Sequence, residues 1–260
     1  MSDFINTDVQ DAVVYLRFNR PEVFNSFNRE MALALQQALD KAEKNKDIRA
    51  IVLTGNGKAF CAGQDLKEVT TPELNPGFKK ILEEHYNPII ARIRSIKKPV
   101  VAAVNGVAAG AGANIALACD VVIANEQASF IQAFSKIGLV PDSGGSYFLP
   151  RLIGFGRASA LMMLGDKVSA AAAVQMGMIF KAVAPEDFEA EVQKTAQTLS
   201  KMPTQALGDI KELLNQSMNN SLKDQLDLES RLQIKSAQSN DYQEGVNAFI
   251  EKRHPNFKGN

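Results

Sequence analysis

The sequence predicts an α/β fold in which a parallel β-sheet is covered by helices on both faces and is followed by a helical C-terminal region. Two observations lead to this prediction. Short, uniformly apolar segments, such as residues 100–104, alternate with helical patterns as far as Pro185. Beyond Pro185 the pattern changes, because four amphipathic helices are predicted in a row with no strand-like segment between them.

The first part of the chain reads as strand, turn and helix. Residues 13–18 are rich in β-branched and aromatic side chains and predict a strand, and the Asn-Arg-Pro-Glu segment at 19–22 predicts a turn. Residues 26–44 predict an amphipathic helix, because apolar residues recur at every fourth position: Phe27, Met31, Leu35 and Leu39. Three further apolar strands are predicted at residues 50–54, 100–104 and 121–124.

The last part of the chain is predicted to be entirely helical. Its predicted helices cover residues 188–199, 204–218, 222–237 and 242–252. We therefore divide the chain into a core at residues 1–185 and a C-terminal helical region at residues 186–260. The apolar stripes of these helices need a surface to cover, either the core of the same chain or a neighbouring subunit.

Composition excludes several classes of protein. Lys and Arg together number 29, as do Asp and Glu, so the formal charge is zero and no basic excess favours nucleic-acid binding. The first ten residues do not resemble a signal peptide, and the most apolar stretch is too interrupted to span a membrane. We expect a cytoplasmic protein in which Cys61 and Cys119 are buried thiols rather than a disulfide.

Two segments of small residues each follow a strand and open a helix. They are FCAGQDL at residues 60–66 and NGVAAGAGAN at residues 105–114. The first N–H groups of a helix have no internal acceptor and lie at the positive end of its dipole, so they can hold an oxygen that gains negative charge. For either segment alone, tight packing of a helix on the sheet is the stronger interpretation. A dinucleotide loop is disfavoured because Ile115 occupies the position of its third glycine, and no phosphate-binding P-loop motif is present.

A third segment places an acid among apolar residues. It reads GLVPDSGGS at residues 138–146 and contains Asp142. Taken alone, an aspartate after a proline is most simply a cap for the following helix.

Together these motifs resemble the crotonase (enoyl-CoA hydratase/isomerase) superfamily. The resemblance rests on FNRP at residues 18–21, Asn25-Ser26, the three segments above with KPVVA at residues 98–102, and AFIEKR and FKG near the C-terminus. It implies the ClpP/crotonase-like fold, a spiral of ββα units with a C-terminal helical region, assembled as a homotrimer or dimer of trimers. It also implies an acyl-CoA thioester as substrate, with coenzyme A entering as part of that substrate and no separate cofactor or metal.

The resemblance assigns site residues one by one. The oxyanion N–H groups are those of Gln64 and Ala111, beside Gly110. Ala62, Gln64, Asp65 and Leu66 are implied to meet the adenine and pantetheine end of coenzyme A. Phe249 and Lys252 match positions that contact the nucleotide, although Lys252 fits a solvated helix face equally well.

The departures from the family pattern predict the reaction. The hydratases carry two glutamates where this chain has Asn114 and Phe134, and the resemblance implies that these two residues contact the substrate. Neither residue can act as a general base, which leaves Asp142 as the acid and base of an isomerase. Ring-epoxide, unsaturated fatty acyl and dehydroadipyl thioesters remain open as substrates, and a hydratase partner is conceivable.

Two alternatives compete with isomerisation. In an aryl-CoA dehalogenase, Asp142 would attack the ring and a histidine such as His85 would activate water. However, the resemblance implies that such dehalogenases carry a tryptophan at the position that Phe134 occupies here. This chain contains no tryptophan. A non-catalytic CoA-binding or partner-binding scaffold would explain the missing glutamates, but it leaves Asp142 without a role.

Overall fold

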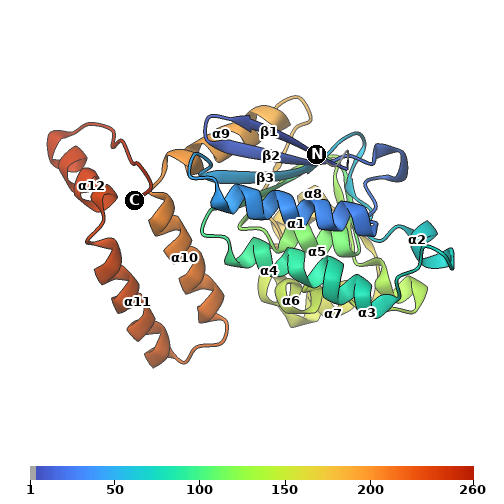
Figure 1. The fold of residues 1–260 in the computed structure, drawn as a ribbon. Coiled ribbons are helices and arrows are strands. Elements are labelled where there is room, and N and C mark those ends of the chain that lie inside the picture. The colour runs from blue at the N-terminus through green and yellow to red at the C-terminus, as the bar shows by residue number, and fades with distance from the viewer. Residues whose placement is uncertain (1–3) are drawn as a thin grey trace.

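The computed structural model describes residues 4–260 and contains two β-sheets set among helices (Figure 1). The larger sheet has the order β1-β2-β3-β5-β7-β10. Its strands are β1 (Ile5–Gln10), β2 (Val13–Phe18), β3 (Ala50–Gly55), β5 (Val100–Val104), β7 (Val121–Asn125) and β10 (Lys181–Val183). All neighbours pair in parallel except β1 and β2, which form an antiparallel pair. The predicted parallel sheet is therefore confirmed, and β1 is an addition that its mostly exposed, polar sequence did not predict.

The smaller sheet has the order β4-β6-β8-β9. Its strands have three residues each: β4 (Ala59–Cys61), β6 (Val107–Ala109), β8 (Ser129–Ile131) and β9 (Lys167–Ser169). Strands β4, β6 and β8 each follow a strand of the larger sheet in the chain, so a repeated unit of two strands and a helical segment builds the structure. This repetition is the spiral that the family resemblance implied.

The helices of the core follow these strand pairs. They are α1 (Arg29–Lys44), α2 (Leu66–Thr70), α3 (Phe78–Lys80), α4 (Asn87–Ser95), α5 (Ala111–Leu117), α6 (Gly145–Ile153), α7 (Phe155–Leu164) and α8 (Ala170–Gln175). The turns η1 (Pro21–Val23) and η3 (Ala133–Ile137) are 3₁₀, and η2 (Ile81–Tyr86) is a π-helical turn between α3 and α4. Helix α1 begins three residues later than predicted, because the side chain of Asn28 accepts a hydrogen bond from Met31 N and caps the helix there.

Both faces of the larger sheet are buried, as predicted. One face, with Leu16, Leu53 and Ala102, packs into the main core. The opposite face, with Tyr15, Val52 and Val101 among its residues, packs against α9 (Phe188–Lys201). Helix α9 therefore belongs with the sheet, and the projecting helices begin one helix later than the predicted boundary at residue 185.

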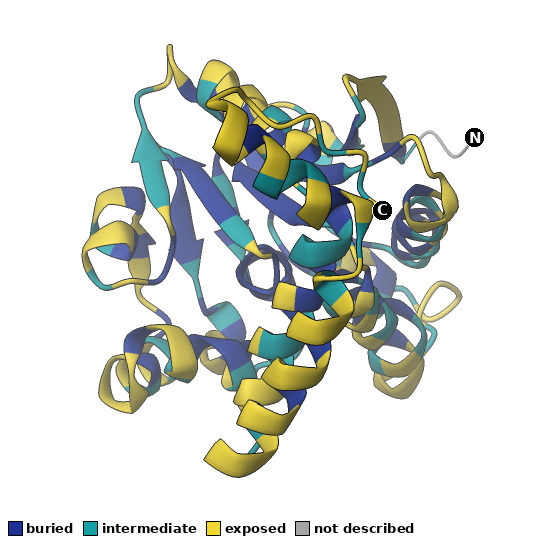
Figure 2. Ribbon diagram, turned by 90° about the vertical axis from the view of Figure 1, so that its left-hand side faces the viewer, coloured by how far each residue is buried: buried dark blue, intermediate teal, exposed yellow. Residues whose placement is uncertain are grey.

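The projecting helices are α10 (Thr204–Ser217), α11 (Leu222–Ser236) and α12 (Asn240–Glu251). They extend to one side of the core in Figure 1 and carry largely exposed surfaces in Figure 2. Buried Lys211 of α10 donates a hydrogen bond of 2.7 Å to Asp120, which anchors this helix to the core. Among residues 4–260, no helix is long and apolar enough to cross a bilayer.

Candidate active site

Three segments that are far apart in the sequence meet at one cavity of about 710 Å³. Eight of the residues singled out by the sequence line it: Ala62, Gln64, Asp65, Leu66, Gly110, Ala111, Phe134 and Asp142. Most of the remaining lining is apolar and comes from α2, the region of η2, and the segment before Asp142: Val69, Phe78, Ile81, Tyr86, Ile137 and Leu139. The cavity thus combines an apolar wall with a few polar groups, as small-molecule sites generally do.

The backbone of the first glycine-rich turn directs the N–H of Gln64 into the cavity. Phe27 N donates to Gly63 O over 2.7 Å, and Asp65 N donates to Phe27 O over 2.8 Å. Both bonds involve the neighbours of Gln64, and successive N–H groups of an extended segment point in opposite directions. The N–H of Gln64 therefore faces away from Phe27, on the cavity side.

The second glycine-rich turn lies directly against the first. Ala111 is the first residue of α5, so its N–H has no acceptor within the helix. A Cβ atom placed on Gly63 would lie 3.6 Å from Ala111 N and 3.0 Å from Ala109 O. Gly63 and Gly110 both have positive φ, +95° and +52°, which side chains with a Cβ rarely adopt. Glycine at both positions therefore lets the two N–H groups approach a common point, as an oxyanion site requires.

The side chain of Gln64 is held at both ends. Tyr86 Oη donates to Gln64 Oε1 over 2.8 Å, and Gln64 Nε2 donates to Glu68 Oε2 over 2.7 Å. Burial raises the pKa of Tyr86 well above its ordinary value, so the phenol stays protonated as a donor. The sequence did not indicate this role for Tyr86, because the π-helical turn brings residues 81 and 86 to one cavity wall and no α-helical periodicity pairs them.

Asp142 supplies a carboxyl group to the cavity. Ser143 Oγ donates to Asp142 Oδ1 over 2.9 Å. Burial raises the pKa of Asp142 from 3.8 to about 6, against the smaller opposing effect of the Ser143 hydrogen bond. The capping alternative is wrong, because α6 begins at Gly145 and has no side-chain cap. A carboxyl group in this position can both accept and return a proton near neutral pH.

The other acid on the cavity wall has a structural partner. Asp65 Oδ2 accepts a hydrogen bond of 2.7 Å from Arg20, and Asp65 Oδ1 accepts one of 3.0 Å from Lys67 N at the start of α2. Its carboxylate thus caps α2 and pairs with Arg20, and we assign it no part in proton transfer.

The two positions that depart from the hydratase pattern differ from each other. Phe134 lines the cavity and its ring faces Gly110, at 3.7 Å from a Cβ placed there. Asn114 is completely buried and is not part of the cavity wall. Both ends of its amide are engaged, since Nδ2 donates to Asp142 O and Oδ1 accepts from Gln132 Nε2. Asn114 therefore lies behind the cavity wall, and its contact with the substrate stays a prediction.

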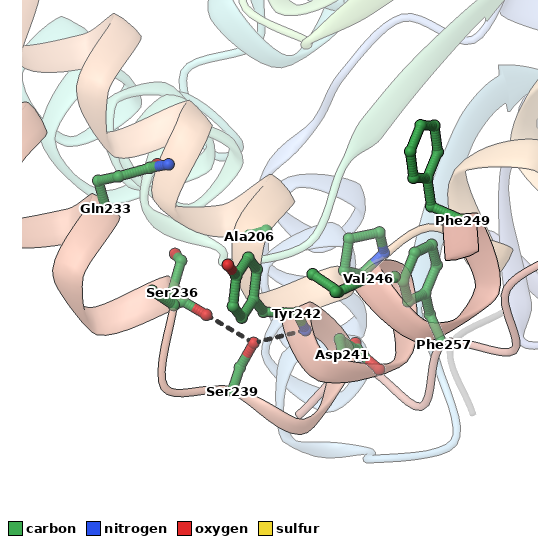
Figure 3. Close-up of a pocket in the computed structure, with 12 residues that line it drawn as sticks. Ala206, Gln233, Ser236, Ser239, Asp241, Tyr242, Val246, Phe249 and Phe257 are labelled. Carbon is green, nitrogen blue, oxygen red and sulfur yellow. Dashed lines mark hydrogen bonds between the residues drawn. The ribbon is translucent and has the colours of Figure 1, made fainter. Parts of the chain in front are cut away.

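Phe249 and Lys252 lie at the far end of the C-terminal helices. Phe249 of α12 is 86% exposed and lines a second pocket, of about 470 Å³, together with Tyr242, Val246 and Phe257 (Figure 3). Lys252 follows the end of α12 and is also exposed. Neither residue lines the Asp142 cavity of its own chain, so their contact with a nucleotide stays a prediction.

His85 is not placed to activate water beside Asp142. It is buried, and its Nε2 lies 3.1 Å from Arg29 Nη1. A guanidinium only donates, so Nε2 accepts, and burial lowers the pKa of His85 below its ordinary value. His85 is absent from the cavity wall, which removes the structural support for dehalogenation. Within the described part of the chain, no cluster of three or more His, Cys, Asp or Glu side chains is arranged to hold a metal ion.

Comparison with known proteins shows the family of the chain. The family model described as enoyl-CoA hydratase/isomerase matches residues 8–260. A 1,2-epoxyphenylacetyl-CoA isomerase of Escherichia coli is 45% identical over the full length of both chains. A trans-2-decenoyl-[acyl-carrier-protein] isomerase of Streptococcus mutans is 37% identical, covering 97% of each chain.

A solved structure extends the likeness to the backbone. The crystal structure of an enoyl-CoA hydratase from Polaromonas sp. JS666 superimposes with a TM-score of 0.91 at 35% identity, covering 97% of this chain and 99% of that one. Both isomerases and hydratases thus occur among the similar proteins. The full-length family match, the sequence identity and the shared fold together show that this chain belongs to the enoyl-CoA hydratase/isomerase family, the crotonases.

Proposed function

We propose that the chain is an acyl-CoA isomerase that holds a thioester enolate on the N–H groups of Gln64 and Ala111 and transfers protons with Asp142. The observation that carries the proposal is the position of Asp142, a carboxyl with raised pKa in the same cavity as the two glycine-rich turns. The names of the two isomerases among its relatives support the same reaction class.

The geometry accounts for each chemical step. A thioester oxygen between the two N–H groups gains negative charge when a proton leaves the neighbouring carbon, and fixed backbone dipoles stabilise that charge. Asp142, ionised above about pH 6, takes the proton and returns it at another carbon. We infer that the reaction needs no cofactor beyond the coenzyme A of its substrate, since these groups supply both charge stabilisation and proton transfer.

The same cavity favours isomerisation over hydration. Hydration needs a water held by groups that can take and give its proton. Asn114 is engaged at both ends behind the cavity, and Phe134 presents an apolar ring. Exclusion of water protects a reactive intermediate from hydrolysis, which suits a reaction whose product is an isomer of the substrate.

The apolar wall supports a bulky or aromatic acyl group. Phe78, Ile81, Tyr86 and Phe134 line the cavity beside the polar groups. We therefore propose the conversion of ring-1,2-epoxyphenylacetyl-CoA to oxepin-CoA as the first candidate reaction. The second candidate is the double-bond shift of a 3-enoyl-CoA to a 2-enoyl-CoA.

One enzyme preparation tests the proposal with three substrates. We expect turnover of ring-1,2-epoxyphenylacetyl-CoA or of a 3-enoyl-CoA, and little hydration of crotonyl-CoA. The variant Asp142→Asn should lower kcat by about 10²–10⁴-fold, the usual contribution of proton transfer, while acyl-CoA affinity stays near that of the wild type. Hydration of crotonyl-CoA as fast as isomerisation, or full activity of Asp142→Asn, would contradict it.

A further inference from the structure

Two buried amides lie behind the Asp142 turn, outside the cavity wall. Asn114 of α5 is completely buried, and Gln132, which precedes η3, is 5% exposed. Gln132 Nε2 donates to Asn114 Oδ1 over 2.7 Å, and Asn114 Nδ2 donates to the main-chain oxygen of Asp142 over 2.9 Å. Two hydrogen bonds in series therefore connect Gln132, the residue after β8, to the main chain of Asp142.

These two hydrogen bonds fix the orientation of the Asn114 amide. A main-chain oxygen only accepts, so the NH₂ group of Asn114 must face Asp142 and its oxygen must face Gln132. The amide also fills the space above Gly145, where a Cβ would lie 2.3 Å from Asn114 Nδ2. Between Asp142 and Gly145 the backbone turns through the left-handed region, with φ of +73° at Gly144, which glycine adopts readily, and +51° at Ser143, which a residue with a Cβ disfavours. Such a turn persists when its surroundings hold it in place.

The arrangement carries a cost in stability that simple packing would avoid. Gln132 Oε1 is buried and has no hydrogen-bond partner among the described residues. A buried acceptor without a partner lowers stability, because the group loses its hydrogen bonds to water and gains none in the folded protein. A leucine or methionine would fill a similar volume without that cost. Of these three side chains, only glutamine has an N–H group that can donate to Asn114.

We propose that Asn114 and Gln132 act as positioning residues, which hold the main chain of Asp142 so that its carboxyl group stays aimed at the oxyanion turns. Neither residue lines the cavity, so the effect passes through Asp142 alone. The inference rests on the proposed role of Asp142 in proton transfer. It assigns Asn114 a task different from the substrate contact expected from the family resemblance.

The test compares Asn114→Leu, Gln132→Leu and the double variant. For each single variant, we expect kcat for isomerisation to fall about ten- to a hundredfold, the usual consequence of small misplacements, with KM nearly unchanged. The pH midpoint of kcat/KM should fall from about 6 towards 3.8, because a released carboxyl group reaches water. Asp65, Lys67 and Tyr86 are the other titratable groups of the cavity wall and are unchanged in these variants.

Coupling between the two residues separates positioning from packing. Gln132 works through Asn114, so Gln132→Leu should cost little further activity once Asn114 is leucine. Gln132→Met also removes the N–H donor while it keeps a similar volume, so it should give a kcat loss similar to that of Gln132→Leu. If Asn114→Leu does not fold, the two Gln132 variants carry the test on their own.

Asn215→Leu is the matched control. Asn215 is also an amide that bridges two elements, through hydrogen bonds with Arg94, but it lies on α10 away from the cavity. The Asn215→Leu variant should have a lower Tm than the wild type but the same kcat and the same pH midpoint of kcat/KM. Unchanged kcat and pH midpoint in the Asn114 and Gln132 variants, or fully additive losses, would overturn the inference.

A direct titration of the Asp142 carboxyl group tests the positioning role independently of the proposed reaction. The carboxyl carbon of Asp142, labelled with ¹³C and assigned by its absence in Asp142→Asn, reports the pKa without any substrate. If no isomerase activity is found, the proposed function fails, and a lowered Asp142 pKa in Gln132→Leu would still support the positioning role. An Asp142 pKa equal to that of the wild type would refute it.

Discussion

At the scale of single residues, burial decides the chemistry of the site. Asp142 and Asp65 both line the cavity, but the Asp65 carboxylate is paired with Arg20, whereas the Asp142 carboxyl accepts a hydrogen bond from the uncharged hydroxyl of Ser143. The pKa of Asp142 consequently rises to about 6, because the charged form loses hydration. Two residues of the same type thus have different roles, set by their partners.

The raised pKa predicts opposite effects of pH on activity and stability. Activity should increase with pH through about 6, where Asp142 becomes an ionised base. Stability should decrease between about pH 4 and pH 6, because in that range the folded state keeps the proton that the unfolded chain, with its ordinary pKa of 3.8, has lost.

Asp142→Asn tests the stability half of that statement. Asparagine cannot ionise, so the free energy of unfolding of this variant should exceed that of the wild type above about pH 6, by up to about 3 kcal/mol. Below about pH 4 the two free energies should match. Calorimetric Tm measured at pH 4 and pH 7.5 checks this. A variant that is less stable than the wild type at both pH values would contradict it.

Ser143 should tune the same carboxyl group. Its hydroxyl stabilises the ionised form of Asp142, so Ser143→Ala should move the pH midpoint of kcat/KM upwards. Ser143→Gly also removes the hydroxyl but suits the positive φ at this position. The two variants should therefore share the midpoint and differ in Tm, with glycine the more stable. A midpoint that stays in place in both would show that the hydroxyl has no influence.

At the scale of elements, the close packing of α5 on β4 brings the two glycine-rich turns together. A Cβ placed on Gly112 would lie 2.3 Å from Cys61 O and 2.7 Å from Cys61 Sγ, so α5 approaches the strand more closely than any side chain permits. The tight-packing and anion-binding interpretations of the glycine-rich segment are thus compatible. The same glycines that allow the packing also place the N–H of Ala111.

Gly112→Ala should therefore damage both stability and activity. Forcing α5 away from β4 should lower the free energy of unfolding by about 1–3 kcal/mol, as overpacking generally does, and should lower kcat by displacing the Ala111 N–H. Denaturant unfolding and steady-state kinetics measure the two effects. Gly156→Ala is the control: it lies in α7 with nothing within 4 Å of the added atom, and should stabilise the protein by up to about 1 kcal/mol. Equal behaviour of the two variants would contradict the packing argument.

At the scale of the whole molecule, the projecting helices leave apolar surface uncovered. Leu222, Phe249 and Ile250 are each more than 70% exposed on α11 and α12. Phe249 and Ile250 are neighbours on α12, and exposed apolar side chains that lie together are typical of surfaces that bind another protein. The C-terminal region extends from the core in Figure 1 and so is available to a second copy of the chain.

We accordingly predict a homotrimer or a dimer of trimers in which these helices form contacts between subunits. Light scattering at micromolar concentration should report three or six chains. Phe249→Ser should weaken the assembly, whereas Val9→Ser, which removes an exposed apolar side chain from β1, should leave it intact. A monomer under these conditions would contradict the prediction.

The sequence by itself determined the parallel strands and the glycine-rich turns, and it singled out Asp142, whose role as the acid stays a prediction. Each of these depends on local patterns: apolar runs, the helix period, and glycine where a Cβ has no room. Tertiary structure alone decided what those residues touch. The hydrogen bond from Tyr86 to Gln64 and the hydrogen bonds that link Gln132, Asn114 and Asp142 each join different segments of the chain. The raised pKa of Asp142 likewise arises from burial by residues of several elements, and no local pattern records that burial.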